Sequence, residues 1–202
     1  MAHSWIDSLH CAATPQTLGY PRNYSSRTEL LEKKVVFDRF MTYAIEHRNN
    51  EQPLCAPSQR LPVQTKTHPR LKCPPDATVF FFYNENGHVT NDRCQPGDPR
   101  GCDGVYPKTT PWTVLWDPSG DLGSATRRDA TAAGSRLVEI GRGWFDDGNC
   151  GNTEKHGRRR AHQGQPCIAL VWHWVFDKIY GVGEEYTTCF DVEIVSTNTT
   201  KK

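Results

Sequence analysis

The sequence predicts a mainly β protein, an immunoglobulin-like or fibronectin-like β-sandwich with long disulfide-stapled loops and little helix. Short stretches rich in β-branched and aromatic residues are separated by long segments rich in glycine, proline and polar residues. Glycine and proline contribute 16 and 14 of the 202 residues, and the Ala/Leu/Glu/Lys excess of a helical bundle is missing. Six tryptophans argue against a disordered chain.

The first half of the chain predicts two strands and one ambiguous element. We expect one short strand before residue 11, an irregular segment over 11–27 and a polar, proline-rich loop over 48–76. Thr28–His47 has apolar residues near helical spacing and Thr28 as a cap, although the run Val35–Phe37 could equally form a strand. The run Ala77–Tyr83 predicts a strand, which ends at the turn Asn84–Gly87.

The second half of the chain predicts four strands separated by long loops. Residues 91–111 hold two cysteines and predict a stapled surface loop, and residues 146–166, with the basic run Arg158–Arg160, predict a solvated loop. The expected strands are 112–116, 136–140, 167–176 and 186–195. Apolar residues alternate with polar ones in the last of them, which predicts a half-buried strand. We expect one domain over 3–196, a polar tail over 197–202, and a leader remnant or engineered start at 1–2.

The charge balance excludes two classes of partner. Lys plus Arg is 24 and Asp plus Glu is 23, whereas a protein that binds nucleic acid by neutralising phosphates carries a clear basic excess. No run of 18 apolar residues exists, so we expect no membrane span. We therefore expect a monomer that partners neither nucleic acid nor membrane.

Eight cysteines are spread along the chain without any CxxC pair, which favours four disulfides over a zinc site. They are Cys11, Cys55, Cys73, Cys94, Cys102, Cys150, Cys167 and Cys189. Loop lengths favour the pairs Cys94–Cys102 and Cys150–Cys167. Disulfides imply an oxidising compartment, and sequons at Asn23 and Asn198 are consistent with a secreted, extracellular glycoprotein.

The start of the chain contains a potential metal ligand. No apolar signal-peptide core precedes Trp5, so the secreted assignment implies that Met1-Ala2 is a remnant and that cleavage after Ala2 leaves His3 first. An amino-terminal histidine offers its α-amine and its imidazole Nδ1 to one metal. One further histidine would complete a T of three nitrogens, which suits copper(II). The alternative is that His3 is an ordinary residue near a frayed terminus.

Three other residues stand out by context. His88 follows a turn at a strand end, where loops present ligands from a rigid scaffold. His173 lies in the middle of an aromatic strand and should be at least half buried. Tyr186 stands three residues before Cys189 on the last strand. Taken singly, each is better explained as an ordinary surface or core residue.

Several stretches together resemble a known group of proteins. In chain order they are His3-Ser4-Trp5, Gly19-Tyr20-Pro21-Arg22, Pro53-Leu54-Cys55, Asn84–Thr90, Phe145–Cys150 and Tyr186–Val192. The pattern resembles the histidine-brace copper proteins, the lytic polysaccharide monooxygenases, and more closely a family of fungal secreted proteins related to them. The resemblance covers nearly the whole chain, and its most specific parts are GHVT and YTTC-x-DV.

The resemblance implies a ligand set for one copper ion. His3 and His88 would be its nitrogen ligands, Tyr186 the axial residue, and His173 a neighbouring histidine that assists. Glu184 falls where some members carry glutamine, but an ionised carboxylate cannot donate a hydrogen bond as an amide does. The chain also departs from the family in Met1-Ala2, which would block the amine of His3.

The activity implied is oxidative cleavage of a cell-wall polysaccharide, with oxygen or peroxide and an external electron donor. Trp5 and Tyr20 are candidates for contacts with the polymer. Two alternatives remain: a secreted copper-binding protein without oxidase activity, and a sandwich that binds carbohydrate or a partner protein without metal. We further expect Cys189 to pair with Cys55 or Cys73, which would fix the strand that carries Tyr186.

Overall fold

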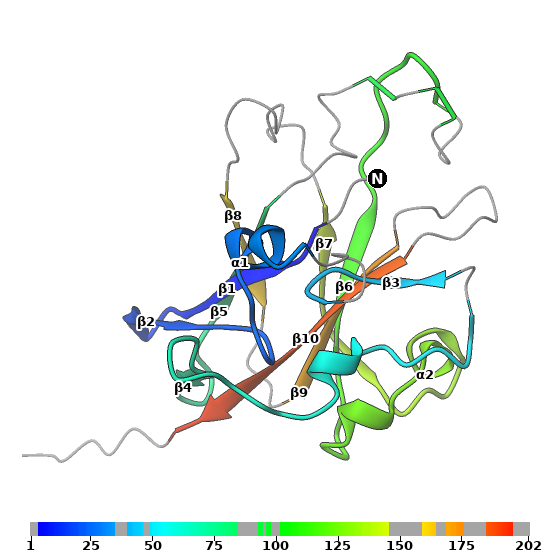
Figure 1. Cartoon of the computed structure of the whole chain (residues 1–202). Helices are drawn as coiled ribbons and strands as arrows, with labels where there is room; N and C mark the ends of the chain where they lie inside the picture. Colours follow the sequence, from blue (N-terminus) through cyan, green and yellow to red (C-terminus); the bar gives the residue numbers. More distant parts are fainter. Residues whose placement is uncertain are drawn as a thin grey trace, which may run out of the picture.

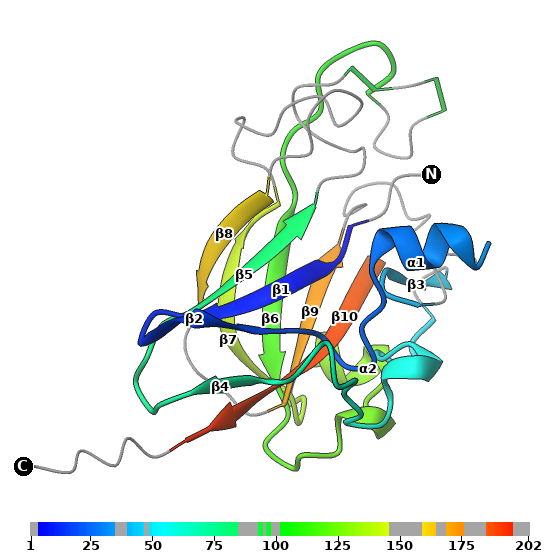
Figure 2. The same ribbon diagram turned by 60° about the vertical axis from the view of Figure 1, so that its left-hand side comes forward.

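The computed structural model describes residues 4–34, 40–46, 49–84, 93–94, 96–97, 102–145, 159–164, 169–175 and 185–195. These residues form two β-sheets packed face to face, as the sequence predicts (Figures 1 and 2). One sheet has the order β2-β1-β5-β8 and comprises Thr14–Gly19, Ile6–Cys11, Val79–Asn84 and Arg159–Gly164. The fold class is therefore confirmed.

The second sheet has the order β3-β10-β9-β6-β7, and β4 pairs with the far end of β10. Its strands are Tyr43–Ile45, Glu185–Ile194, Ala169–Val175, Pro111–Trp116 and Val138–Trp144, with β4 at Leu71–Cys73. Only β4 runs parallel to its neighbour. The short helices are α1 at Arg27–Glu32, α2 at Arg127–Thr131, η3 at Pro57–Gln59 and η4 at Leu122–Ser124.

Aromatic side chains fill the space between the sheets. Phe81 of β5 meets Trp112 of β6 edge-on, with ring centroids 5.0 Å apart. Phe145, just after β7, stacks on Trp174 of β9 at 3.8 Å. Both tryptophans are at most 1% exposed, and rings of this size bury more apolar area than any other side chain. This layer fixes how the two sheets lie on each other.

The last strand is buried on both faces, so the prediction of a half-buried strand is wrong. Residues 185–192 of β10 are all buried, and only the end of the strand is exposed. One face contributes Tyr186 and Phe190 to the core between the sheets. The other face contributes Cys189 to a second cluster beneath the segments that carry Leu54 and Leu122. The alternation of apolar and polar residues does not predict the burial of β10, because loop segments cover the outer face of the strand.

Several elements differ from the sequence-based expectations, and one of them is the strand β3, which lies within the segment 28–47 that has helical spacing. The helix predicted from residue 28 is only six residues long, and Ser26, rather than Thr28, caps it through a capping box with Glu29. β2 and β4 lie in segments expected to be irregular, because pairing with β1 and β10, and not an apolar pattern, holds them. The expected loop 146–166 contains β8, so Arg159 and Arg160 belong to a strand paired with β5. The run 35–37 lies outside the described residues.

Three disulfides join the six described cysteines: Cys11–Cys73, Cys55–Cys189 and Cys94–Cys102. The short-loop pair is confirmed, and so is the attachment of Cys189 to a cysteine of the first half. The proposed pair Cys150–Cys167 lies outside the described residues.

Candidate functional site

The candidate site lies where β1 begins and β5 ends. Ile6 at the start of β1 pairs with Tyr83 near the end of β5, so the chain enters one strand and leaves the other at the same place. Figure 2 shows the start of β1, the arrowhead of β5 and the start of β10 all at the upper end of the sandwich. His3 precedes this pair and His88 follows it, and both lie outside the described residues.

Tyr186 lies at this same end of the molecule. It is 3% exposed and pairs with Trp174 of β9 on one side and Ala44 of β3 on the other. A row of aromatic rings joins it to β5. Tyr83 stacks on Phe145 with ring centroids 5.3 Å apart, Phe145 stacks on Trp174 at 3.8 Å, and Trp174 lies tilted against Tyr186 at 5.5 Å. The predicted axial residue therefore belongs to the interior between the sheets, close to the β1–β5 end.

His173 is buried, as predicted, but it faces away from Tyr186. In the register of β9 and β10, Trp174 pairs with Tyr186 and His173 pairs with Thr187, and successive side chains point to opposite faces. His173 is 4% exposed and its Nε2 lies 3.0 Å from Glu185 Oε2. Because an ionised carboxylate only accepts hydrogen bonds, Nε2 is the donor. The structure thus does not bring His173 and Tyr186 together on one face.

Glu185 is the centre of a buried polar network that the sequence analysis missed. Arg127, the first residue of α2, donates to both carboxylate oxygens at 2.9 and 2.8 Å and also donates to Asn50. Burial alone would raise the pKa of Glu185, but the hydrogen bonds from His173 and Arg127 outweigh it and lower the pKa to about 2. This carboxylate is therefore a fixed negative charge, and its neighbour Glu184 lies outside the described residues.

A signal for this network exists in the sequence. Glu185 and Tyr186 are consecutive residues of one strand, so strand alternation alone puts Glu185 on the face opposite to Tyr186. The resemblance points to Glu184 rather than to Glu185. The paired charge of Arg127, 58 residues away, has no local signal.

The two predicted polymer contacts differ in exposure. Trp5 is 1% exposed and packs in a small cluster with Leu30 and Met41, where the guanidinium of Arg27 lies 5.1 Å from its ring centre. A buried ring cannot lie against a polymer, so Trp5 is corrected to a core residue. Tyr20 is partly exposed, and its ring meets His68 edge-on at 4.8 Å. Tyr20 alone keeps the predicted role.

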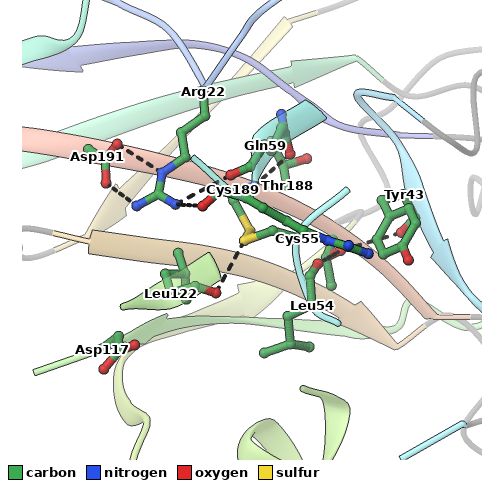
Figure 3. The surroundings of a disulfide bond; sticks show 12 residues. Arg22, Tyr43, Leu54, Cys55, Gln59, Asp117, Leu122, Thr188, Cys189 and Asp191 are labelled. Atoms are coloured by element: carbon green, nitrogen blue, oxygen red, sulfur yellow. Dashed lines mark hydrogen bonds and ion pairs between the residues drawn. A yellow bond between two sulfur atoms is a disulfide. The ribbon is translucent and has the colours of Figure 1, made fainter. Parts of the chain in front are cut away.

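A rigid clamp holds the strand that carries Tyr186 (Figure 3). Cys189, three residues further along β10, is bonded to Cys55. Arg22 donates to both oxygens of Asp191 at 2.9 and 2.6 Å, and to the carbonyls of Gln59 and Arg60. Arg22 is 2% exposed, so a charged, bidentate pair lies fully inside the protein. These bonds fix β10 to the segment 53–60.

Within the described part of the chain, no group of three or more His, Cys, Asp or Glu side chains is placed to hold a metal ion. None of the helices there is long and apolar enough to cross a membrane. Any metal site at the β1–β5 end would therefore need residues beyond the described ones, as the predicted ligands His3 and His88 are.

Comparison with known families assigns the chain to one of them. The model of a family described as Domain of unknown function (DUF7492) matches residues 1–166. The chain belongs to the DUF7492 family. The match contains β1 to β8 and the positions of both His3 and His88, and it ends before β9 and β10. No curated protein matches the chain.

Proposed function

We propose that this DUF7492 protein is a secreted copper enzyme that cleaves a cell-wall polysaccharide oxidatively. The observation that carries the proposal is the pairing of Ile6 with Tyr83, which brings the entry to β1 and the exit from β5 together. His3 precedes Ile6 by three residues and His88 follows Tyr83 by five. At about 3.6 Å per extended residue, these connections span at most about 11 and about 18 Å, so both histidines can reach one metal ion.

The donor set suits copper. The amine and imidazole of an amino-terminal His3 and the imidazole of His88 would supply three nitrogens in a T, the arrangement that copper(II) prefers. Copper, when bound, would supply the oxidising power for breaking a C–H bond. Tyr186 would lie beside it, held by the Cys55–Cys189 bond and by Trp174. The described residues thus supply the axial Tyr186 and its buried surroundings, whereas the nitrogen ligands His3 and His88 lie outside them.

Secretion is part of the same proposal. The three disulfides are typical of proteins that fold in an oxidising compartment. Tyr20, partly exposed beside His68, is the proposed contact with the polymer. The reaction would use oxygen or peroxide and an external electron donor.

Copper titration of protein with His3 confirmed as its first residue tests the ligand set. We expect one copper ion per chain, and His88→Ala should weaken binding by more than about 100-fold, because loss of a ligand exceeds the 10–100-fold cost of losing a supporting residue. His68→Ala is the matched control, since His68 contacts Tyr20 and Thr65 instead. Equal binding by wild type and His88→Ala would overturn the ligand set.

Activity is tested on insoluble cell-wall polysaccharides with a reductant and oxygen or peroxide. Oxidised oligosaccharides, detected by mass spectrometry only with copper-loaded protein, are the expected products. Tight copper binding without products would favour a copper-binding protein without oxidase activity. Absence of copper binding would favour the carbohydrate- or partner-binding sandwich.

A further inference from the structure

Asn23 is a partly exposed asparagine between two buried residues. Arg22 and Tyr24 are 2% and 9% exposed: the first is paired with Asp191, and the second donates to Asp7. Asn23 between them is partly exposed, in a turn ahead of α1, with φ at 46°. With both neighbours buried, Asn23 is the residue between them that reaches solvent in part.

Asn23 also lies against exposed apolar residues. Its backbone N–H donates to the carbonyl of Val63 at 2.8 Å. Val63 is 48% exposed and the nearby Leu61 is 68% exposed, whereas the rings of Tyr20 and Tyr24 pack against His68. The turn therefore borders a small apolar surface formed by Leu61 and Val63.

We propose that Asn23 carries an N-linked glycan and that its first sugars cover Leu61 and Val63. The sequence Asn23-Tyr24-Ser25 is an acceptor sequon, and three disulfides are consistent with passage through the compartment where such sequons are modified. Asn23 Nδ2 forms a bond to C1 of a lipid-linked oligosaccharide. The bond from C1 to the lipid diphosphate breaks, the lipid diphosphate leaves, and one amide proton is released. The glycan is independent of the copper proposal and shares with it only the secretory route.

A backbone role offers a competing explanation for this asparagine. Asparagine tolerates a positive φ better than most residues, so Asn23 could be needed for the turn alone. Asn23→Asp keeps most of that tolerance and removes the acceptor amide. Ser25→Ala keeps Asn23 and destroys the sequon, and Ser25→Thr preserves the sequon. Ser26, not Ser25, caps α1, so neither change at Ser25 removes a helix cap.

Peptide mapping of protein secreted from a eukaryotic host tests occupancy. We expect the peptide containing Asn23 to carry a glycan in wild type and in Ser25→Thr, and to lack it in Ser25→Ala and Asn23→Asp. An unmodified Asn23 peptide in the secreted wild type overturns the proposal. Because the wild-type peptide alone shows whether Asn23 is occupied, the test does not depend on whether a variant is secreted. Peptide mapping also distinguishes a glycan at Asn23 from one at the Asn198 sequon.

Aggregation tests what the glycan covers. Light scattering during heating should show an earlier onset for Ser25→Ala than for Ser25→Thr, because Leu61 and Val63 become bare. Adding Leu61→Ser and Val63→Ser to the Ser25→Ala protein should raise its aggregation onset most of the way back to that of Ser25→Thr. Equal onset for Ser25→Ala and Ser25→Thr would show that the glycan does not cover these residues.

Discussion

Glu185 shows how one buried carboxylate can tie three segments together. Its oxygens accept from His173 on β9 and from Arg127 on α2, while Glu185 itself begins β10. Both ion-pair partners are largely buried, with side-chain exposures of 2% for Glu185 and 13% for Arg127. Removing one member of such a pair leaves an uncompensated charge inside the protein, which costs far more than losing a surface pair.

The depressed pKa of Glu185 predicts a loss of stability in acid. Its pKa falls from 4.5 to about 2 on folding, so the folded state favours the ionised carboxylate by about 3 kcal/mol. That contribution is complete above pH 4.5 and is lost as the pH falls toward 2. Urea unfolding at a series of pH values should show this decline. Glu185→Gln should be less stable at pH 7 by about 3 kcal/mol and should depend less on pH below 4.5.

A surface pair supplies the control for this prediction. Glu51 pairs with Arg128, and both side chains are about two-thirds exposed. Glu51→Gln should therefore change the unfolding free energy by no more than about 1 kcal/mol and leave the acid slope as in wild type. Identical acid slopes in wild type and Glu185→Gln would contradict the role assigned to Glu185.

At the scale of a single element, the packing of β7 against β6 depends on one glycine that lies close to a ring of β6. A Cβ added at Gly143 would lie 2.3 Å from Cζ2 of Trp112, a buried ring in the core. Gly143→Ala should therefore destabilise the protein by about 1–3 kcal/mol, because the ring cannot move without disturbing its neighbours. Gly141, two residues earlier on the same strand, is the matched control: a Cβ there meets only Val114 at 3.8 Å. Urea unfolding measures the free energy of unfolding of both variants. Equal values would show that the Trp112 ring moves aside at little cost.

The disulfides that join elements should differ in how much they stabilise the folded protein. Cys55–Cys189 closes a loop of 134 residues and Cys94–Cys102 one of 8. The chain-entropy model gives about 5 kcal/mol for the first and about 2.5 kcal/mol for the second. Replacing each pair by alanines and measuring thermal unfolding should show the larger loss for Cys55–Cys189. A larger loss from the short loop would mean that native contacts around Cys94–Cys102, and not loop closure, dominate.

Across the whole molecule, the sequence predicted the strands with a strong apolar pattern and missed those without one. Val79–Asn84, Pro111–Trp116 and Ala169–Val175 are rich in aromatic and β-branched residues, and each was expected within two residues of its bounds. β2 is held by backbone pairing with β1, and β4 by pairing with β10 and by the Cys11–Cys73 bond to β1, so their own residues contain little information. The Arg127–Glu185 pair was equally invisible, because it depends on which loops fold over β10.

The candidate site could likewise be predicted only in part from the sequence. Tyr186 is a candidate only because its spacing to Cys189 matches the family that the chain resembles, and the structure buries it between the sheets beside Trp174. The face of His173 could be read only from the register of β9 with β10. The exposure of Trp5 could not be read from its position, since a tryptophan next to a strand fits core and surface equally well.

The amino terminus carries the last prediction. If Met1-Ala2 is retained, the α-amine of His3 becomes an amide nitrogen, which offers no free lone pair to copper unless it is deprotonated. The site then falls from three good nitrogens to two imidazoles and loses the chelate ring. We expect the chain that begins at Met1 to bind copper much more weakly than a chain that begins at His3, with little or no oxidase activity. The difference should persist across neutral pH, because modest titration frees a protonated amine but not an amide. Calorimetric copper titration of the two chains at pH 6, 7 and 8 measures this; equal tight binding would show that the amine is not a ligand.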